Sequence, residues 1–248
     1  MVGRLLLRGM LAGVIAGLLA FGFARAVGEP QIEQAIAFER HMDHAKGETP
    51  GPELVSRATQ AGAGLLVGVV VYGAAIGGLF SLVFAFVYSR FGRLSPRTTA
   101  ALLAAAAFVS FVLVPALKYP ATPPAVGEPD TIGSRTALYF AMLVISIIAL
   151  IFAIGLAMGL TRQYGNWNAG LVGAAAYVAI VAIAGYGLPD VSEVPDHFSA
   201  VLLWKFRIAS LGLQLVLWTT VGLVFGLLAG RLLTREPPGQ LSYSGARH

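Results

Sequence analysis

The sequence contains no cysteine, which excludes disulfide bonds and thiolate metal sites. Carboxylates, imidazoles, carbonyl oxygens and water remain as possible metal ligands. Charge is also scarce, because Asp, Glu, Lys and Arg make up 12% of the 248 residues, against about 25% in soluble domains. Hydrophobic residues make up 57%, and the mean hydropathy is +0.77. This composition excludes an ordinary soluble domain and indicates a membrane protein.

The common catalytic signatures are missing as well. The sequence has no G-x-x-x-x-G-K-[ST], no H-E-x-x-H and no dinucleotide-binding glycine pattern. We therefore predict that the chain is not an enzyme and binds no cofactor permanently. The net charge of +5 does not predict nucleic-acid binding, because the arginines flank apolar runs, where membrane topology accounts for them.

The apolar residues are arranged in six uncharged runs. Five of the runs have 20 to 32 residues, and about 20 residues are enough to cross the hydrocarbon core as a helix. Backbone groups in that core must bond within the segment, which favours helices. The chain is therefore predicted to be all-α and polytopic, with one transmembrane domain over residues 1–248. The runs are 9–24, 58–89, 98–117, 136–161, 163–189 and 208–230.

The first run leaves two interpretations open. Arg4 and Arg8 before it and the small residues Ala24 and Ala26 at its end are typical of a secretory signal cleaved after Ala26. Residues 5–7 extend the apolar stretch if Arg8 snorkels to the interface, and signal peptides have apolar regions of only about 7 to 15 residues. We therefore expect six transmembrane helices, or five if the first helix is a cleaved signal.

The charges between the runs predict the orientation. With a cytoplasmic amino terminus, 11 of the 12 acids fall on the opposite face, and Glu236 is the exception. The short loop 90–97 carries three arginines and no acid, which favours a cytoplasmic position. We predict that both termini are cytoplasmic and that residues 236–248 form a disordered cytoplasmic tail. The extracytoplasmic segments are named the first (28–57), second (118–135) and third (190–207) acidic loops.

Internal similarity predicts that the helices form three similar helical hairpins. Residues 100–109 resemble residues 169–178 at a shift of 69, so the third and fifth runs look like copies. The stretch Ala-Val-Gly-Glu-Pro occurs at 26–30 and again at 125–129, and Glu-Val-Pro occurs at 193–195. Each predicted hairpin therefore carries a carboxylate near a proline in its acidic loop.

These three carboxylates, Glu29, Glu128 and Glu193, have two possible roles. They could ring an entrance around a pseudo-threefold axis, or Gly-Glu-Pro could simply end a helix and begin a loop. Proline fixes its own φ and disfavours helix in the preceding residue. We therefore predict extended backbone at Glu29 and Glu128.

The first acidic loop is predicted to contain a short helix over residues 31–45, which Gly47 and Pro50 end. Helical spacing places Glu29, Glu33, Arg40 and His44 in one stripe. His41 and His44, with Asp43 between them, could form an imidazole and carboxylate site for Co²⁺, Ni²⁺ or Zn²⁺. The alternative is a charged helix face in contact with water.

The second and third acidic loops carry the remaining candidates. Glu128 and Asp130 could be cation ligands, or they could pair with Lys118 and Arg135. Within the apolar runs, Gln214 could face a pore or bond a neighbouring helix. The runs contain no Asp, Glu or Lys, and so lack the titratable group that a proton-coupled pump uses.

Seven motifs are spread along nearly the whole chain, namely GEPQIEQAIAFE (28–39), VSR (55–57), LKYPATPPAVG (117–127), TIGSRT (131–136), LP (188–189), EVP (193–195) and LWKFR (203–207). Together they resemble the CbtA family of predicted cobalt transporter subunits. The resemblance implies a bacterial inner-membrane protein that admits Co²⁺ for cobalamin synthesis. It also implies a small membrane partner with a histidine-rich metal-binding tail. Glu29, Glu33, Glu39, Glu128 and Glu193 fall in its motifs, whereas His41 and His44 do not clearly belong to them.

We therefore predict a membrane subunit of a divalent transition-metal importer, surrounded by lipid, whose extracytoplasmic carboxylates attract the cation. The alternative function is a non-transporting structural or assembly subunit of a membrane complex. The predicted metal-site residues are Glu29, Glu33, Glu39, His41, His44, Glu128, Asp130 and Glu193.

Overall fold

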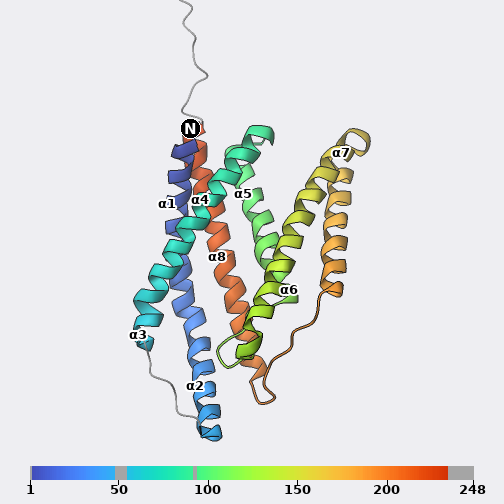
Figure 1. The fold of residues 1–248 in the computed structure, drawn as a ribbon. Coiled ribbons are helices and arrows are strands. Elements are labelled where there is room, and N and C mark those ends of the chain that lie inside the picture. The colour runs from blue at the N-terminus through green and yellow to red at the C-terminus, as the bar shows by residue number, and fades with distance from the viewer. Residues whose placement is uncertain (1, 48–54, 92–93, 234–248) are drawn as a thin grey trace, which may run out of the picture. The chain divides into compact units, whose positions relative to one another are not determined.

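The computed structural model describes residues 2–47, 55–91 and 94–233, which form helices joined by turns, with no strand among them. The all-α prediction is therefore confirmed, while the predicted tail 236–248 lies outside the described residues. The elements in Figure 1 are α1 (Val2–Phe23), the π-helical turn η1 (Ala24–Gly28), α2 (Glu29–Lys46), α3 (Arg57–Thr59), the π-helical turn η2 (Gln60–Gly64), α4 (Leu65–Phe91), α5 (Pro96–Ala107), the π-helical turn η3 (Phe108–Leu113), α6 (Val114–Lys118), the 3-10 turn η4 (Pro129–Thr131), α7 (Ile132–Gly187) and α8 (Ala200–Leu233).

Five helical segments of the described chain are long and apolar enough to cross a membrane. In the fourth, φ of 74° and ψ of 166° at Gly165 break the helix, and α7 turns back on itself (Figure 1). The arms 132–164 and 166–187 correspond to the fourth and fifth apolar runs. The protein is a multi-pass membrane protein, and the count of six crossings stays a prediction. The five segments are Val2–Ala45, Arg57–Arg90, Pro96–Lys118, Pro129–Gly187 and Ala200–Leu233.

The contacts divide the chain into two compact units, and α1, α4, α5 and α8 contribute residues to both. The first unit contains Met1–Leu19, Leu66–Ala105 and Leu217–His248, and the second contains Ala20–Leu65 and Ala106–Val216. The single transmembrane domain over residues 1–248 stays a prediction.

In the first unit, glycines let helices approach closely. The Cβ of any larger residue at Gly13 of α1 would lie 2.7 Å from the carbonyl carbon of Gly73 in α4. Gly9 and Gly77 form a second contact of this kind along the same pair of helices. Small residues of this type allow backbones to touch, which is the main source of helix association in lipid.

The same unit places aromatic rings between α4 and α8. Phe84 and Phe225 are fully buried, with ring centroids 4.9 Å apart in an edge-to-face arrangement. Gly222 and Gly226 of α8 lie against Ala104 and Ala100 of α5. The alanine-rich third run is therefore packed against the sixth run in this unit.

The second unit contains a buried polar contact between the arms of α7. The hydroxyl groups of Ser146 and Tyr177 are 2.8 Å apart in a hydrogen bond. Met142, Ala149 and Ala153 of the first arm surround this contact, together with Val114 of α6. The third, fourth and fifth runs therefore share one core, whereas the arrangement as three equivalent hairpins stays a prediction.

Serine side chains cap the starts of α3 and α8. Ser56 accepts a hydrogen bond from the Thr59 amide at the start of α3, and Ser199 accepts one from the Leu202 amide at the start of α8. Such side chains satisfy amides that have no partner within the helix. Glycine caps the C-terminal end of α2, where Gly47 has φ of 73°. Residues 31–45 are helical, as part of α2, which belongs to the helical segment Val2–Ala45.

One backbone prediction was wrong. Glu29 is helical, with φ of −55° and ψ of −41°, although Pro30 follows it. The ring of Pro30 would press on the carbonyl of Ala26 in a regular α-helix, but the π turn η1 widens the helix at this point. The first span therefore continues into α2 without a break. Glu128, by contrast, is extended as predicted, with φ of −85° and ψ of 140°.

Candidate functional site at the acidic loops

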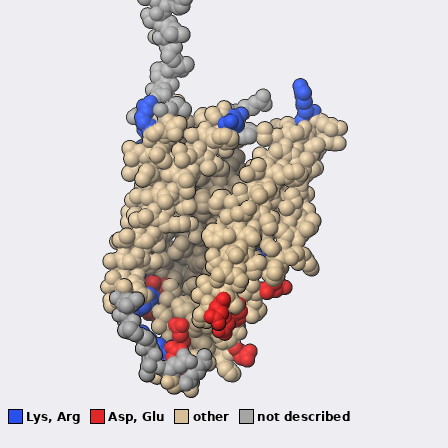
Figure 2. Space-filling model, viewed as in Figure 1, with Lys and Arg blue, Asp and Glu red and all other residues tan. Residues whose placement is uncertain are grey.

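The described acidic residues all belong to the second unit, where they gather at one end (Figure 2). The described charged residues of the first unit are all arginines, namely Arg4, Arg8, Arg90, Arg97 and Arg231. Among the described residues, acids therefore occur only in the second unit, whereas arginines occur in both units.

Glu29 is a buried member of an ion pair. The residue is 5% exposed, and its carboxylate pairs with the guanidinium of Arg57. Helix α2 positions Glu29 in its first turn, and Ser56 begins the helix that carries Arg57. Burying a carboxylate requires such a partner. Glu29 therefore joins the first span to the second, and a cation could bind it only by competing with Arg57.

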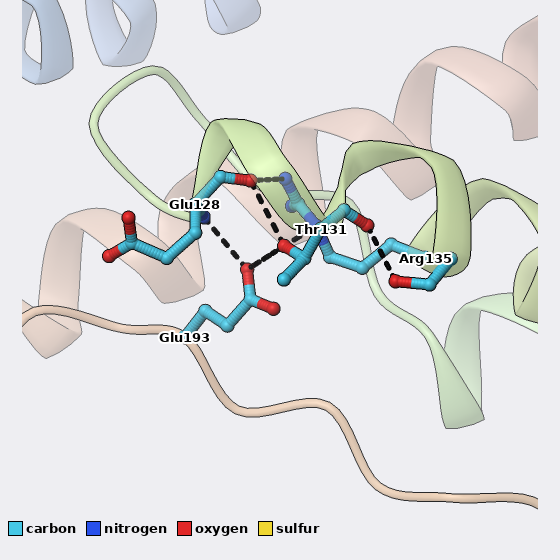
Figure 3. A network of polar contacts seen from close by, with 5 residues as sticks. Glu128, Thr131, Arg135 and Glu193 are labelled. Carbon is cyan, nitrogen blue, oxygen red and sulfur yellow. Dashed lines mark hydrogen bonds and ion pairs between the residues drawn. The ribbon is translucent and has the colours of Figure 1, made fainter.

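Glu193 connects the third acidic loop to the second (Figure 3). Its Oε2 accepts hydrogen bonds from the Glu128 amide and from the Thr131 hydroxyl, both at 2.8 Å. The same oxygen lies 3.3 Å from Nε of Arg135 in an ion pair. Glu193 therefore pairs with the arginine at the start of the fourth run, and not with Arg207 of its own predicted hairpin.

These contacts change the ionisation of Glu193. The hydrogen bond from the Glu128 amide, followed by that from Thr131, lowers the pKa of Glu193 below its ordinary value, and the Arg135 charge acts in the same direction. A lowered pKa means that the contact stabilises the fold at and above the ordinary pKa of glutamate. This contribution is lost as the pH falls through the lowered pKa.

A second connection joins the beginnings of the same two loops. Lys118 forms an ion pair with Asp190, and the Tyr119 hydroxyl donates a hydrogen bond of 2.8 Å to the carbonyl oxygen of Pro189. Of the alternatives that the sequence leaves for Asp130, pairing with Lys118 or Arg135 is not observed, because these cations contact Asp190 and Glu193.

Helix α2 covers part of these loops with one face. Phe38 meets Phe198 edge-to-face, with ring centroids 5.1 Å apart, and Ala35 is buried in a cluster with Val126 and Leu202. Other side chains of α2 are exposed. They include Glu33, Glu39, Arg40, His41 and His44.

The eight predicted site residues therefore have different surroundings. Glu29 and Glu193 are held in ion pairs with arginine, whereas the other six are exposed on α2 and at the start of η4. Among the described residues, no group of three or more His, Asp or Glu side chains could hold a metal ion as it stands. These carboxylates can attract cations through their charge, but they do not form a closed coordination shell in the described part of the chain.

Two contacts of the acidic loops were not predicted from the sequence. One is the hydrogen bond from the Thr131 hydroxyl to Glu193, and the other is the ion pair of Lys118 with Asp190, which joins residues 72 positions apart. Opposite charges at the edges of neighbouring loops are the only sequence signal for these contacts, and that signal does not select one partner among several.

The chain matches the CbtA family, described as a probable cobalt transporter subunit, over residues 2–230. No curated protein and no solved structure matches the chain. The matched region includes the five apolar helical segments almost entirely and all eight predicted site residues.

Proposed function

Because the chain belongs to the CbtA family of probable cobalt transporter subunits, we propose that it is the membrane subunit of an importer that supplies Co²⁺ for cobalamin synthesis. Membership makes it a transporter subunit, and a subunit implies a partner and a metal ion as cargo. The observation that supports import most directly is the gathering of carboxylates at one end of the second unit (Figure 2).

The exposed carboxylates would attract the ion. Glu33, Glu39, Glu128 and Asp130 are exposed, so a hydrated cation can approach them without displacing an arginine. Such a charged surface raises the local concentration of counter-ions. Glu29, His41 and His44 remain candidate ligands for a later step, in which the ion sheds part of its hydration shell.

The energy for import would come from the membrane potential. With an interior that is negative by about 100 mV, a divalent cation gains about 4.6 kcal/mol on entry, twice the value for a single charge. This direction requires the acidic loops to be extracytoplasmic. We therefore place the protein in the bacterial inner membrane with both termini in the cytoplasm, where the arginines of the first unit follow the positive-inside rule.

The proposed partner is a small membrane protein with a histidine-rich metal-binding tail. Imidazole groups bind Co²⁺, and the exposed side chains of α2 add no closed metal site of their own among the described residues. Such a tail would hold the ion between its capture by the acidic loops and its passage.

The alternative is a structural or assembly subunit that does not transport. The observation that favours it is the exposure of α7. Only 22% of an apolar 18-residue stretch of this helical segment is buried within the chain. In that case, α7 would pack against another membrane protein, and the chain would copurify with it in a fixed ratio.

Cobalt uptake tests the proposal. We expect cells that lack other cobalt uptake to accumulate Co²⁺ at low external concentration when they produce this chain with its partner, even in excess Mg²⁺. A variant with Glu33→Gln, Glu39→Gln, Glu128→Gln and Asp130→Asn should need a higher cobalt concentration for half-maximal uptake.

The matched control keeps the charges, with Glu33→Asp, Glu39→Asp, Glu128→Asp and Asp130→Glu, and should transport normally at low cobalt. Uptake that is the same with and without the chain, in the presence of the partner, would reject the importer and favour the assembly subunit.

A further inference from the structure

The second and third acidic loops are joined at two places and form one clamped structure. Near their beginnings, Lys118 pairs with Asp190. Farther along, Glu193 contacts the segment that carries Glu128. In addition, Val126 of the second loop is buried in a cluster with Phe198 of the third. The two loops therefore cannot move independently without breaking polar and apolar contacts together.

The clamp holds the backbone of Glu128 on both sides. Its amide donates to Oε2 of Glu193 at 2.8 Å, and its carbonyl oxygen accepts from Nη2 of Arg135 at 3.1 Å. The preceding amide, of Gly127, donates to the carbonyl oxygen of Glu193 at 3.2 Å. The carboxylate of Glu128 takes part in none of these contacts and points away from them (Figure 3).

Gly127 is required for this geometry. Its φ is 106°, a value that side chains disfavour. In addition, the space that a Cβ would need is filled by the Arg135 guanidinium, whose Cζ would lie 2.6 Å away. An alanine at this position would therefore push Arg135 out of the clamp without changing any charge.

The same contacts oppose a role for Glu193 as an ion ligand. A cation on Oε2 would displace two hydrogen-bond donors. It would also stand beside the positive charge of Arg135, 3.3 Å from that oxygen, which repels it. The Glu128 carboxylate meets neither obstacle, because it is exposed.

We propose that Glu193 is a positioning residue, which fixes the backbone of Glu128 so that the Glu128 carboxylate stands free as the cation ligand of the second acidic loop. The assignment of Glu128 as a ligand rests on the proposed function. The clamp itself does not, and it can be measured without transport.

Amide hydrogen exchange of residues 125–131 in the purified full-length chain tests the clamp. Glu193→Ala, Thr131→Val and Gly127→Ala disturb it in three different ways, and each should make exchange of this segment several-fold faster. Glu193→Gln keeps an acceptor oxygen and should have a smaller effect. Asp196→Asn, an exposed acid of the same loop, is the matched control and should leave the exchange unchanged. Unchanged exchange in Glu193→Ala would overturn the clamp.

Cobalt uptake by the same variants separates positioning from ligation. The three clamp variants should raise the half-saturating cobalt concentration several-fold and keep the maximal rate. Glu128→Gln should do so without faster exchange. If Glu193→Gln abolishes uptake while Thr131→Val and Gly127→Ala transport normally, Glu193 is a ligand and the proposal is wrong. If the unaltered chain with its partner takes up no cobalt, the proposed function fails, and hydrogen exchange alone decides the clamp.

Discussion

At the scale of single residues, the hydrogen bond between Ser146 and Tyr177 allows the stability contributed by one buried polar contact to be measured. The two hydroxyls are 2.8 Å apart between the arms of α7. Hydrogen bonds between membrane helices contribute about 0.6 kcal/mol on average and up to about 1.7 kcal/mol. We therefore expect Tyr177→Phe to lower the free energy of unfolding by an amount in this range, measured by titration with a denaturing detergent in mixed micelles.

Tyr186 supplies the matched control for this measurement. It lies on the same arm of α7 and is 97% exposed, so Tyr186→Phe removes a hydroxyl that is not part of the core. Its free energy of unfolding should match that of the unaltered protein. Equal losses in both variants would show that the Ser146 contact does not account for the effect.

In the acidic loops, the backbone conformation at some residues could be predicted from the sequence, whereas their tertiary partners could not. Glu128 is extended as its proline predicts, whereas Glu29 is helical because the π turn η1 accommodates Pro30. The following proline therefore accounts for the backbone of Glu128, whereas the preceding π turn accounts for the backbone of Glu29. The partner of Glu193 was not predictable, since Arg135 and Arg207 carry the same charge and the tertiary fold selects between them.

At the scale of helices, the crossing of α1 and α4 depends on glycine. We expect Gly13→Ala to destabilise the protein by about 1 to 3 kcal/mol, the usual cost of overpacking, because its Cβ would meet the backbone of Gly73. The same detergent titration measures this change. Gly68→Ala, in α4, is the control, because nothing lies within 4 Å of its added Cβ. A loss at Gly68 as large as that at Gly13 would contradict the role of the crossing.

Helices were more predictable than their boundaries. The uncharged runs mark the apolar helices because hydrocarbon excludes both charge and unpaired backbone. Composition does not fix where a helix ends. Glycines occur throughout the apolar runs, and only the fold shows that Gly165 breaks α7. Similarly, α8 begins at Ala200, ahead of the charged residues Lys205 and Arg207, because Ser199 caps it there.

At the scale of the whole molecule, the distribution of charge relates topology to transport. Carboxylates occur in the described part of the second unit, and the described charges of the first unit are arginines. If the acidic loops faced the cytoplasm, the membrane potential would drive a divalent cation toward them and hold it there. Import down the potential therefore depends on one orientation, which makes topology the decisive property of the proposed function.

Single cysteines can test this orientation, because the chain has none of its own. His197 lies in the third acidic loop, and Gln163 lies beside the turn of α7. Both residues are exposed, so each can be replaced by a cysteine that a reagent can reach. A membrane-impermeant maleimide should label His197→Cys in intact cells, and should label Gln163→Cys only after the membrane is opened. Gly3→Cys, in the first turns of α1, should behave as Gln163→Cys if the first helix is retained with its amino terminus in the cytoplasm. Labelling of Gln163→Cys in intact cells would place the acidic loops in the cytoplasm, and the ion could then not be imported by the route proposed above.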